Sequence, residues 1–400
     1  MGLDSREVTP QLTKAVVHLA GEIRSFERVE IATDKVLGQK VSRSTVRRLA
    51  KQVGLELAKV EEAGEWTEKE VIVPEIAVVS CDGGRIRTRE PGRGRGVHLS
   101  GENGWRETKN SSLERMCKNA QHARDDDPCP ALPTSFRTTA KVANIAEKPV
   151  PIVDEATDPE AADTEENRVI YQGPKRLLRT ALSSMACSDD FGRMMKREAE
   201  RRRFYDAHGR AFIGDGLNWN WSVWKKYFPT FVPILDFIHA IQYIFAAAMA
   251  MTSDETEGWS TYVRLVTRCW QGHVDSVIEE ITAVCQERGI PLEEKVADDD
   301  PHKPLADAIR YLTNNRTRMD YPRYRRLGLP VTSAPMESLI KQINFRVKGT
   351  EMFWDDPEGA EAILHIRSAL LSEDDRFDDY LSNRPGWQFQ RRTTAPAVAA

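Results

Sequence analysis

The 400-residue sequence lacks several features that would assign it to a class at once. Its 6 cysteines are scattered without close pairs, a usage typical of a reducing compartment and not of a disulfide framework. No apolar segment follows a basic start, so we expect no signal peptide. The most apolar stretch, residues 243–251, is too short to span a bilayer. These absences predict a cytoplasmic protein.

The sequence also lacks the overall positive charge of a uniformly basic nucleic-acid binder, since its net charge is −4. The charge is unevenly distributed, however. Residues 1–60, 174–203 and 316–348 are net basic by +4, +5 and +6, whereas residues 118–166 are net acidic by −6. Separate basic stretches suit a protein that meets DNA on particular faces. The alternative is the ordinary solvated surface of helices.

Three acidic residues have settings that suit metal ligands. Asp82 follows the apolar run 76–81 and Asp215 follows the run 211–214, and each precedes a glycine. Glu337 opens a stretch with helical spacing. Mg²⁺ prefers oxygen ligands, and a carboxylate cluster can hold two cations for phosphoryl transfer. The alternative is that each Asp-Gly pair is a turn after a strand.

Residues near the N-terminus have the pattern of a helix-turn-helix. A helix over 27–37 ends at Gly38, and Ser42 is placed to cap a second helix that Gly54 closes. Three basic residues fall on its outer face at helical spacing: Arg43, Arg47 and Lys51. This layout is typical of a DNA-recognition helix. A plain three-helix support domain is the alternative.

The remaining chain predicts strands followed by alternating strands and helices. The predicted strands lie at 76–82, 83–90 after a tight turn, 105–116, 210–215 and 231–236. Residues 174–205 read as a long basic helical segment, and residues 257–315 and 357–383 as mostly helical. The pattern predicts an α/β protein. Its RNase H-like catalytic core would carry an all-helical insertion and follow a small helical helix-turn-helix domain.

The predicted division of the chain follows from these elements. The parts are a helix-turn-helix domain (1–64), the first part of the core with strands 1–3 (65–117), an acidic linker or insertion (118–173), the second part of the core (174–256), a helical insertion (257–330), the Glu337 helix with a C-terminal helical region (331–384), and a frayed tail (385–400).

Four stretches of the chain are similar to a known family. They are Val41–Gly54; Ser80–Gly83 with 105–109; Phe212–Gly216 with Ile234–His239; and Asn315–Trp354. On these motifs the chain resembles the DDE transposases of bacterial insertion sequences, in particular the Kra branch, which is related to the Mutator-like group. It departs from the usual form at 331–335, where many relatives have Gly-Ser-Gly, and at Val347, where Met is usual.

The resemblance implies a catalytic and metal-binding triad of Asp82, Asp215 and Glu337. It implies Asp236 and His239 as candidate accessory residues, with a structural histidine as the alternative. Two Mg²⁺ ions would serve both strand cleavage and strand transfer, with Mn²⁺ as a substitute.

The expected partners are double-stranded DNA, namely terminal inverted repeats and target DNA, and further copies of the chain in a dimer or larger assembly on the nucleoid. Arg346 and Lys348 would grip backbone phosphates, or else complement the end of their helix. Two other functions stay open, a domesticated DNA-binding descendant and a metal-dependent RNase H-like nuclease without strand transfer.

Overall fold

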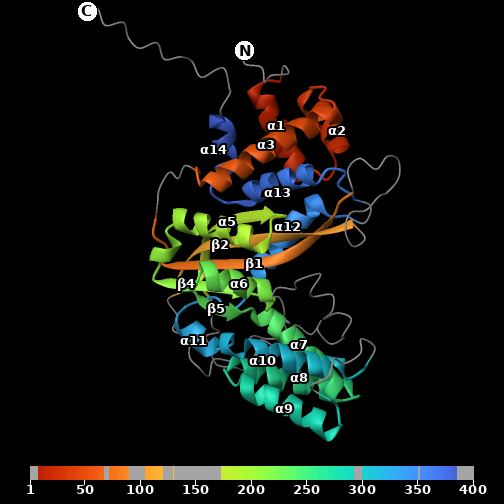
Figure 1. Ribbon diagram of the computed structural model, residues 1–400, viewed down its shortest axis with the longest axis vertical. Helices are drawn as coiled ribbons and strands as arrows, with labels where there is room; N and C mark the ends of the chain where they lie inside the picture. Colours follow the sequence, from red (N-terminus) through yellow and green to blue (C-terminus); the bar gives the residue numbers. More distant parts are fainter. Residues whose placement is uncertain are drawn as a thin grey trace, which may run out of the picture.

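A computed structural model describes residues 8–66, 72–89, 104–119, 129, 173–291, 300–349 and 352–384 of the chain. The described part is a mixed α/β protein built around one five-stranded sheet. Figure 1 shows the sheet near the middle of an elongated molecule, with a group of helices at each end. The predicted acidic segment 118–173 and the tail 385–400 lie almost wholly outside the described residues.

The sheet has the strand order β3-β2-β1-β4-β5. Its strands are β1 (Ile76–Arg87), β2 (Trp105–Cys117), β3 (Lys175–Ser184), β4 (Gly209–Gly214) and β5 (Val232–Leu235). The first three strands pair antiparallel, whereas β4 pairs parallel to β1 and β5 parallel to β4. The strands predicted at 105–116, 210–215 and 231–236 are confirmed to within a few residues. The strands at 210–215 and 231–236 are apolar runs that need no distant partner to be recognised.

Two predictions of secondary structure are wrong. The tight turn expected after Asp82 is absent, because β1 continues to Arg87 and pairs with β2 along its whole length. Gly84 allows this, since a side chain there would begin 2.6 Å from the Thr108 hydroxyl across the pair. The long helix expected over 174–205 is instead β3 followed by α5 (Ser188–Arg201). Pairing with β2 decides the conformation of 175–184, which helical propensity alone does not predict.

The first three helices share a hydrophobic core with the last helices of the chain. The helices of this group are α1 (Pro10–Glu22), α2 (Phe26–Leu37), α3 (Arg43–Ala63), α12 (Ala334–Val347), α13 (Pro357–Leu371) and α14 (Arg376–Asn383). Figure 1 shows α13 between the first helices and the sheet. The predicted boundary at residue 64 therefore does not separate two independent cores.

The predicted ends of the first helices are partly confirmed. Gly38 closes α2 in the left-handed conformation, with φ +63°, and the Ser42 hydroxyl caps α3 by accepting from the Thr45 amide at 3.3 Å. Gly54 does not end α3, which runs on to Ala63. It lies instead where α3 crosses α13, and a Cβ built on it would stand 2.2 Å from the Ala362 carbonyl oxygen. The glycine permits a close helix crossing.

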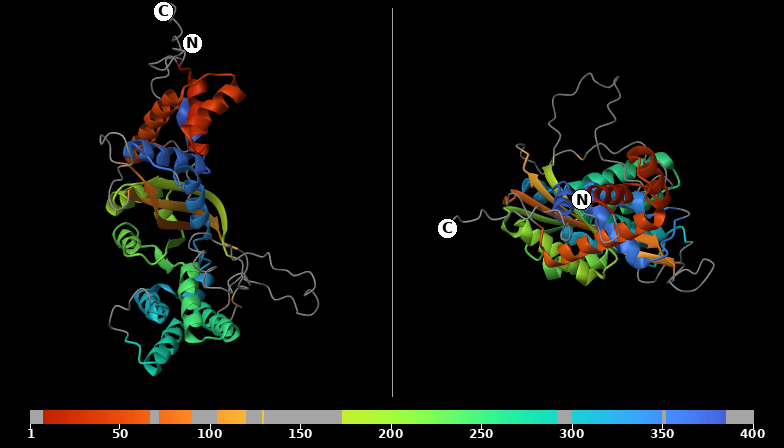
Figure 2. Two further views of the ribbon diagram at one scale, coloured as in Figure 1. Left: turned by 90° about the vertical axis from the view of Figure 1, so that its right-hand side faces the viewer. Right: turned by 90° about the horizontal axis from the view of Figure 1, so that it is seen from above.

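The region between β5 and α12 is mostly helical, as predicted for residues 257–315. Its elements are α7 (Phe237–Met251), α8 (Glu255–Trp270), α9 (Val274–Glu287), α10 (Lys303–Asn315), the 3₁₀ turn η4 (Arg316–Arg318) and α11 (Tyr321–Arg326). These helices gather at the end of the molecule opposite α1–α3 (Figures 1 and 2). Within the described residues, no helix combines the length and the apolar character needed to cross a membrane.

The sheet is covered on both faces. Helices α5 and α6 (Asn218–Tyr227) pack against β2, β3 and β4, while α12 packs against β1 and β2. Because side chains alternate along a strand, Ser80, Asp82 and Ile86 share one face of β1. Ile86 belongs to the core that includes α12, so this is the face on which Glu337 and Asp82 meet.

Candidate active and metal site

Three aspartates occupy one row across neighbouring parallel strands. The register pairs Cys81 with Gly214, and Gly214 with Leu235. The next residues along the three strands are Asp82, Asp215 and Asp236. Residues side by side in parallel strands point to the same face, so the sheet delivers three carboxylates to one place. Asp82 lies within β1, whereas the other two lie just past their strands.

Glu337 reaches this row from the first turn of α12. Ligand atoms of Asp236, His239 and Glu337 all lie within 4.8 Å of one another. The charges of Asp236, His239 and Asp82 all act on Glu337, and those of Asp215, His239 and Asp236 act on Asp82. The structure thus brings together all five residues predicted as catalytic or accessory, with Asp236, His239 and Glu337 forming the tightest set in its described part.

Asp236 is the anchor of this set. It is fully buried, and both its carboxylate oxygens are occupied. One oxygen accepts from the Ser333 amide at 3.0 Å, and the other accepts from the Ser333 hydroxyl at 2.8 Å and lies 2.7 Å from His239 Nδ1. These bonds leave Asp236 little capacity to bind a cation directly. Asp236 instead holds His239 in place beside the other carboxylates.

Asp215 is held by its own loop and by the helical region. Its Oδ1 accepts from the Leu217 amide at 2.9 Å and from the amide side chain of the buried Asn220 at 2.5 Å. The Tyr311 hydroxyl donates to the Asp215 backbone carbonyl at 2.6 Å. Two elements far apart in the sequence, α6 and α10, therefore fix the position of this carboxylate.

The site has an excess of negative charge in a buried setting. Burial, followed by the charge of Asp215, raises the pKa of Asp82 to about 7. Burial and the charge of Asp236 raise the pKa of Glu337 to about 7, and burial also raises the pKa of Asp215. Each shift means that the charged carboxylate is disfavoured as the protein stands.

His239 carries the compensating positive charge. Burial alone would lower its pKa, but the hydrogen bond that it donates to Asp236 and the charges of Asp236, Asp215 and Asp82 raise it to about 9. The same contact lowers the pKa of Asp236 despite its burial. At neutral pH the pair is a protonated imidazole beside a carboxylate.

The residues present fit a divalent cation. Glu337 Oε2 is buried and has no hydrogen-bond partner among the described residues. An unpaired buried carboxylate oxygen is costly, and a cation would satisfy it. Asp82, Asp215 and Glu337 supply the oxygen ligands that Mg²⁺ and Mn²⁺ prefer. A cation would also relieve the repulsion among the carboxylates.

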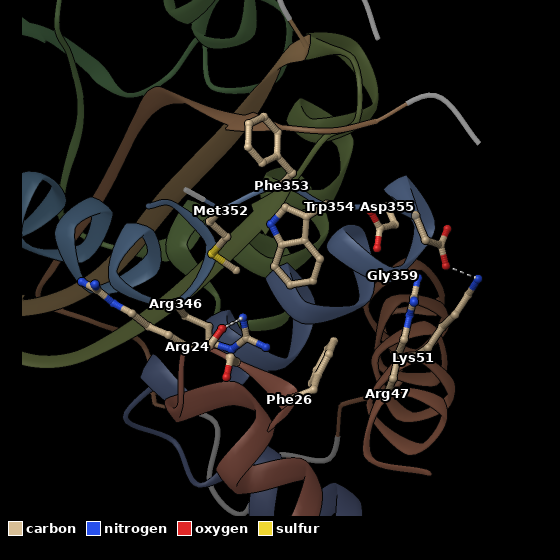
Figure 3. A pocket seen from close by; sticks show the side chains of 12 residues that line it. Arg24, Phe26, Arg47, Lys51, Arg346, Met352, Phe353, Trp354, Asp355 and Gly359 are labelled. Carbon is tan, nitrogen blue, oxygen red and sulfur yellow. Dashed lines mark hydrogen bonds and ion pairs between the residues drawn. The ribbon is translucent and has the colours of Figure 1, made fainter. Parts of the chain in front are cut away.

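The predicted DNA-reading residues of α3 do not all remain available. Arg43 and Arg47 are exposed. Lys51 instead forms ion pairs with Asp356 at 2.7 Å and Glu358 at 2.5 Å. Figure 3 shows Arg47 and Lys51 rising from α3 along one side of a pocket of about 280 Å³, with Trp354 and Phe26 between them and Arg346. Lys51 joins α3 to the start of α13, so the prediction that it reads DNA is not supported.

Arg346 cannot contact a phosphate as predicted, because it is buried with only 1% of its surface exposed. Its Nε donates to the Ala20 carbonyl at 2.6 Å and its Nη1 to the Arg24 carbonyl at 3.2 Å. The guanidinium also lies over the rings of Phe26 and Trp354, at 5.2 and 5.3 Å. It closes the end of α1 and does not contact the solvent. Lys348 is exposed, with its ammonium 5.5 Å from the Trp105 ring.

Three supporting residues were missed by the sequence analysis: Asn220, Tyr311 and Ser333. None stands beside an apolar run, and each acts on a residue that is distant in sequence or belongs to another element. The only local signal is at Ser333, which lies four residues before Glu337. That spacing alone does not reveal a contact with Asp236.

Comparison with known proteins adds no assignment. The chain matches no protein-family model, and no curated protein matches its sequence.

Proposed function

We propose that this protein is a DNA transposase of a bacterial insertion sequence. It binds the terminal inverted repeats of its element, cleaves a phosphodiester bond at each end and joins the exposed 3′-OH to target DNA. The observation that carries the proposal is the row of Asp82, Asp215 and Asp236, with Glu337 facing it from α12. The strand order β3-β2-β1-β4-β5, with three antiparallel strands followed by two parallel ones, supports the proposal of an RNase H-like core.

The helical region fits the predicted all-helical insertion. It follows β5 and its helix α7, precedes the Glu337 helix, and fixes Asp215 through Tyr311. An insertion at this place leaves the sheet unbroken and delivers Glu337 to it from a later part of the chain.

The residues of the site have two different roles in this proposal. Asp82, Asp215 and Glu337 would hold Mg²⁺ or Mn²⁺, while Asp236 orients His239 beside them. When bound, the cations would supply Lewis acidity for in-line displacement at phosphorus, with water or a 3′-OH as the nucleophile. The protonated His239 would place a positive charge and a donor next to the scissile phosphate.

The DNA-reading surface in this proposal is the exposed part of α3, with Arg43 and Arg47. Gly38 and Ser42 set the turn before α3, and a helix with an exposed basic face after such a turn suits a major groove. Lys348 is an additional exposed cation near the end of the Glu337 helix. Handling two ends together implies a dimer or larger assembly on DNA.

Cleavage of the DNA that flanks the coding region tests the proposal. The wild-type protein should cut it at the ends of an inverted repeat in Mg²⁺ or Mn²⁺. Asp82→Asn, Asp215→Asn and Glu337→Gln should each abolish cutting and keep binding in a gel-shift assay. Glu279→Gln, an exposed acid on α9, is the matched control and should cut normally.

The outcomes separate the proposal from its alternatives. A wild-type protein that binds the repeats but never cuts them would be a domesticated binding protein. One that cuts but never joins a 3′-OH to target DNA would be a nuclease. Any triad variant that cuts at nearly the wild-type rate would remove that residue from the triad.

A further inference from the structure

A polar pocket of about 490 Å³ opens beside the Asp215 loop. We call it the Tyr311 pocket and define it by the lining residues Gly216, Trp221, Tyr243, Tyr311, Asn314 and Arg318. One wall belongs to the loop that carries Asp215. The opposite wall is formed by α10 and η4 of the helical region. The pocket therefore lies directly against the proposed active site.

The wall at Tyr311 is built in contact with the Asp215 loop. The Tyr311 hydroxyl donates to the Asp215 carbonyl at 2.6 Å, and its ring stacks on Tyr243 with 3.8 Å between centroids. Gly216 has φ +99°, and a Cβ there would stand 2.7 Å from the Tyr311 ring. A side chain at 216 is thus excluded twice, by conformation and by space. The pocket cannot move without moving Asp215.

Arg318 brings an uncompensated positive charge to this pocket. Its guanidinium lies 4.4 Å from the Trp221 ring centroid and donates to the Asn314 carbonyl at 3.2 Å and the Asn315 side chain at 3.3 Å. No carboxylate pairs with it in the described part of the chain. The other arginine lining the pocket, Arg310, does have a partner, Asp307. A guanidinium held over an aromatic ring, with further donors to spare, is suited to a phosphate.

The size and lining of the pocket limit the ligand. A volume of about 490 Å³ falls within the range of small-molecule sites, and a duplex cannot enter such a pocket. The exposed amides of Asn218 and Asn314 offer both donors and acceptors to a base edge. The Trp221 ring is covered by Arg318 and the two tyrosine rings stack on each other, so recognition of the ligand depends on Arg318 and on these amides.

We infer that the Tyr311 pocket holds one unstacked nucleotide of the DNA strand next to the scissile phosphate, with its phosphate on Arg318. This rests on the proposed function, because it takes the strand to be held at the carboxylates of the proposed active site, beside which the pocket lies. Removing one nucleotide from the stack would bend the strand away from the duplex and present the neighbouring phosphate to the carboxylates. The helical region would thereby select the bond to be cut.

Binding of a short fluorescent single-stranded oligonucleotide, measured by anisotropy in the presence of a chelator, tests the pocket without cleavage. Arg318→Ala should weaken binding about tenfold, the loss expected of one charge-assisted phosphate contact. Arg316→Ala is the matched control, since Arg316 is exposed on the same turn but does not line the pocket. Asn314→Trp would fill the pocket from an exposed position and should weaken binding without affecting folding.

The outcomes distinguish the pocket from the proposed function. If Arg318→Ala, Asn314→Trp and the wild-type protein bind the oligonucleotide equally well, the assignment of a nucleotide to the pocket is overturned, even if the wild-type protein cuts DNA. If binding of the oligonucleotide depends on Arg318 but the protein never cuts DNA, the proposed function is overturned, whereas nucleotide binding in the pocket is supported. Displacement of the oligonucleotide by an equimolar free deoxynucleoside monophosphate would show a small-molecule site and refute the DNA-strand assignment.

Discussion

The crossing of α3 and α13 at Gly54 offers a sharp test of how the N-terminal helices are attached. The change is Gly54→Ala. Its Cβ would stand 2.2 Å from the Ala362 carbonyl oxygen and 2.6 Å from the Ala362 Cα and carbonyl carbon. These are backbone atoms in the middle of α13, so they cannot turn aside as a flexible side chain could.

The expected size of the effect follows from two opposing terms. Alanine in a helix interior is favoured over glycine by about 1 kcal/mol. Overpacking a buried contact typically costs about 1–3 kcal/mol and occasionally more. Because the contact is with backbone at both helices, we place the overpacking cost at or beyond the upper end of that range. The free energy of unfolding should therefore fall by roughly 2 kcal/mol.

Urea denaturation followed by circular dichroism measures this change. Lys59→Ala, at an exposed position of the same helix, is the control and should leave the unfolding free energy within about 0.5 kcal/mol of wild type. If Gly54→Ala were as stable as the wild-type protein, or more stable, the alanine would meet no steric cost and only the gain in helix propensity would be seen. That result would contradict the close crossing of α3 and α13 and their shared core.

Further predictions concern Arg346, His365 and α3. Arg346→Leu should lower the free energy of unfolding by about 2 kcal/mol or more, because the Ala20 and Arg24 carbonyls lose their buried donor. Lys348→Ala should leave the free energy of unfolding unchanged and weaken DNA binding. Glu61 and Glu361 raise the pKa of His365 from its ordinary 6.5 to about 10, so its stabilising contribution is complete below pH 6.5 and lost as the pH rises through 10. Urea titrations should therefore show wild-type stability falling toward that of His365→Gln between pH 7 and 10, and parallel curves would contradict the ion-pair assignment. Replacing Arg43 and Arg47 together by alanine should reduce the affinity for the terminal repeat by at least tenfold and flatten its salt dependence. Lys51→Ala should mainly lower the free energy of unfolding, because it loosens α3 from Asp356. Normal affinity for the repeat in the double variant would contradict the DNA-reading role of α3.

Much of the candidate site could be predicted because its carboxylates follow apolar runs. Asp215 and Asp236 come directly after the buried strands β4 and β5, and Asp82 follows a buried run within β1, level with them. Glu337 could be placed at the start of a helix from its spacing. Pairing of the strands in the sheet, and packing of α12 against it, then bring these four acidic residues together in one cluster. Local sequence predicted the element of each acid, and it placed Asp215, Asp236 and Glu337 at the ends where they lie, but it wrongly ended the strand of Asp82 at that residue.

The other parts of the structure depend on contacts that no local pattern records. Arg346 looks like a surface cation at the end of a helix, yet it meets the Ala20 carbonyl 326 positions earlier in the chain. Gly54 looks like a helix end, but the approach of α13 explains why glycine is there. Residues 175–184 carry a basic, helix-compatible sequence and become a strand because β2 offers an edge to pair with.

Cation binding by the carboxylate cluster tests the central claim most directly. A raised pKa of about 7 for Glu337 means that the folded protein disfavours its charged form. At pH 8 this costs stability, because the ordinary pKa is 4.5 and the unfolded chain is already ionised. Glu337→Gln should therefore be more stable than wild type when no metal is present, since it removes a carboxylate whose charged form is disfavoured by burial and by Asp236.

Melting temperature measured at pH 8 with and without millimolar Mg²⁺ or Mn²⁺ is the experiment. The wild-type protein and Glu279→Gln should be stabilised as the concentration of the cation rises above its dissociation constant, whereas Asp82→Asn and Glu337→Gln should gain little. The difference in melting temperature between Glu337→Gln and the wild-type protein should thus become smaller, or change sign, when the cation is added. A wild-type protein that does not respond to either cation, or a Glu337→Gln variant that responds as fully as wild type, would contradict the assignment of these carboxylates as a metal site.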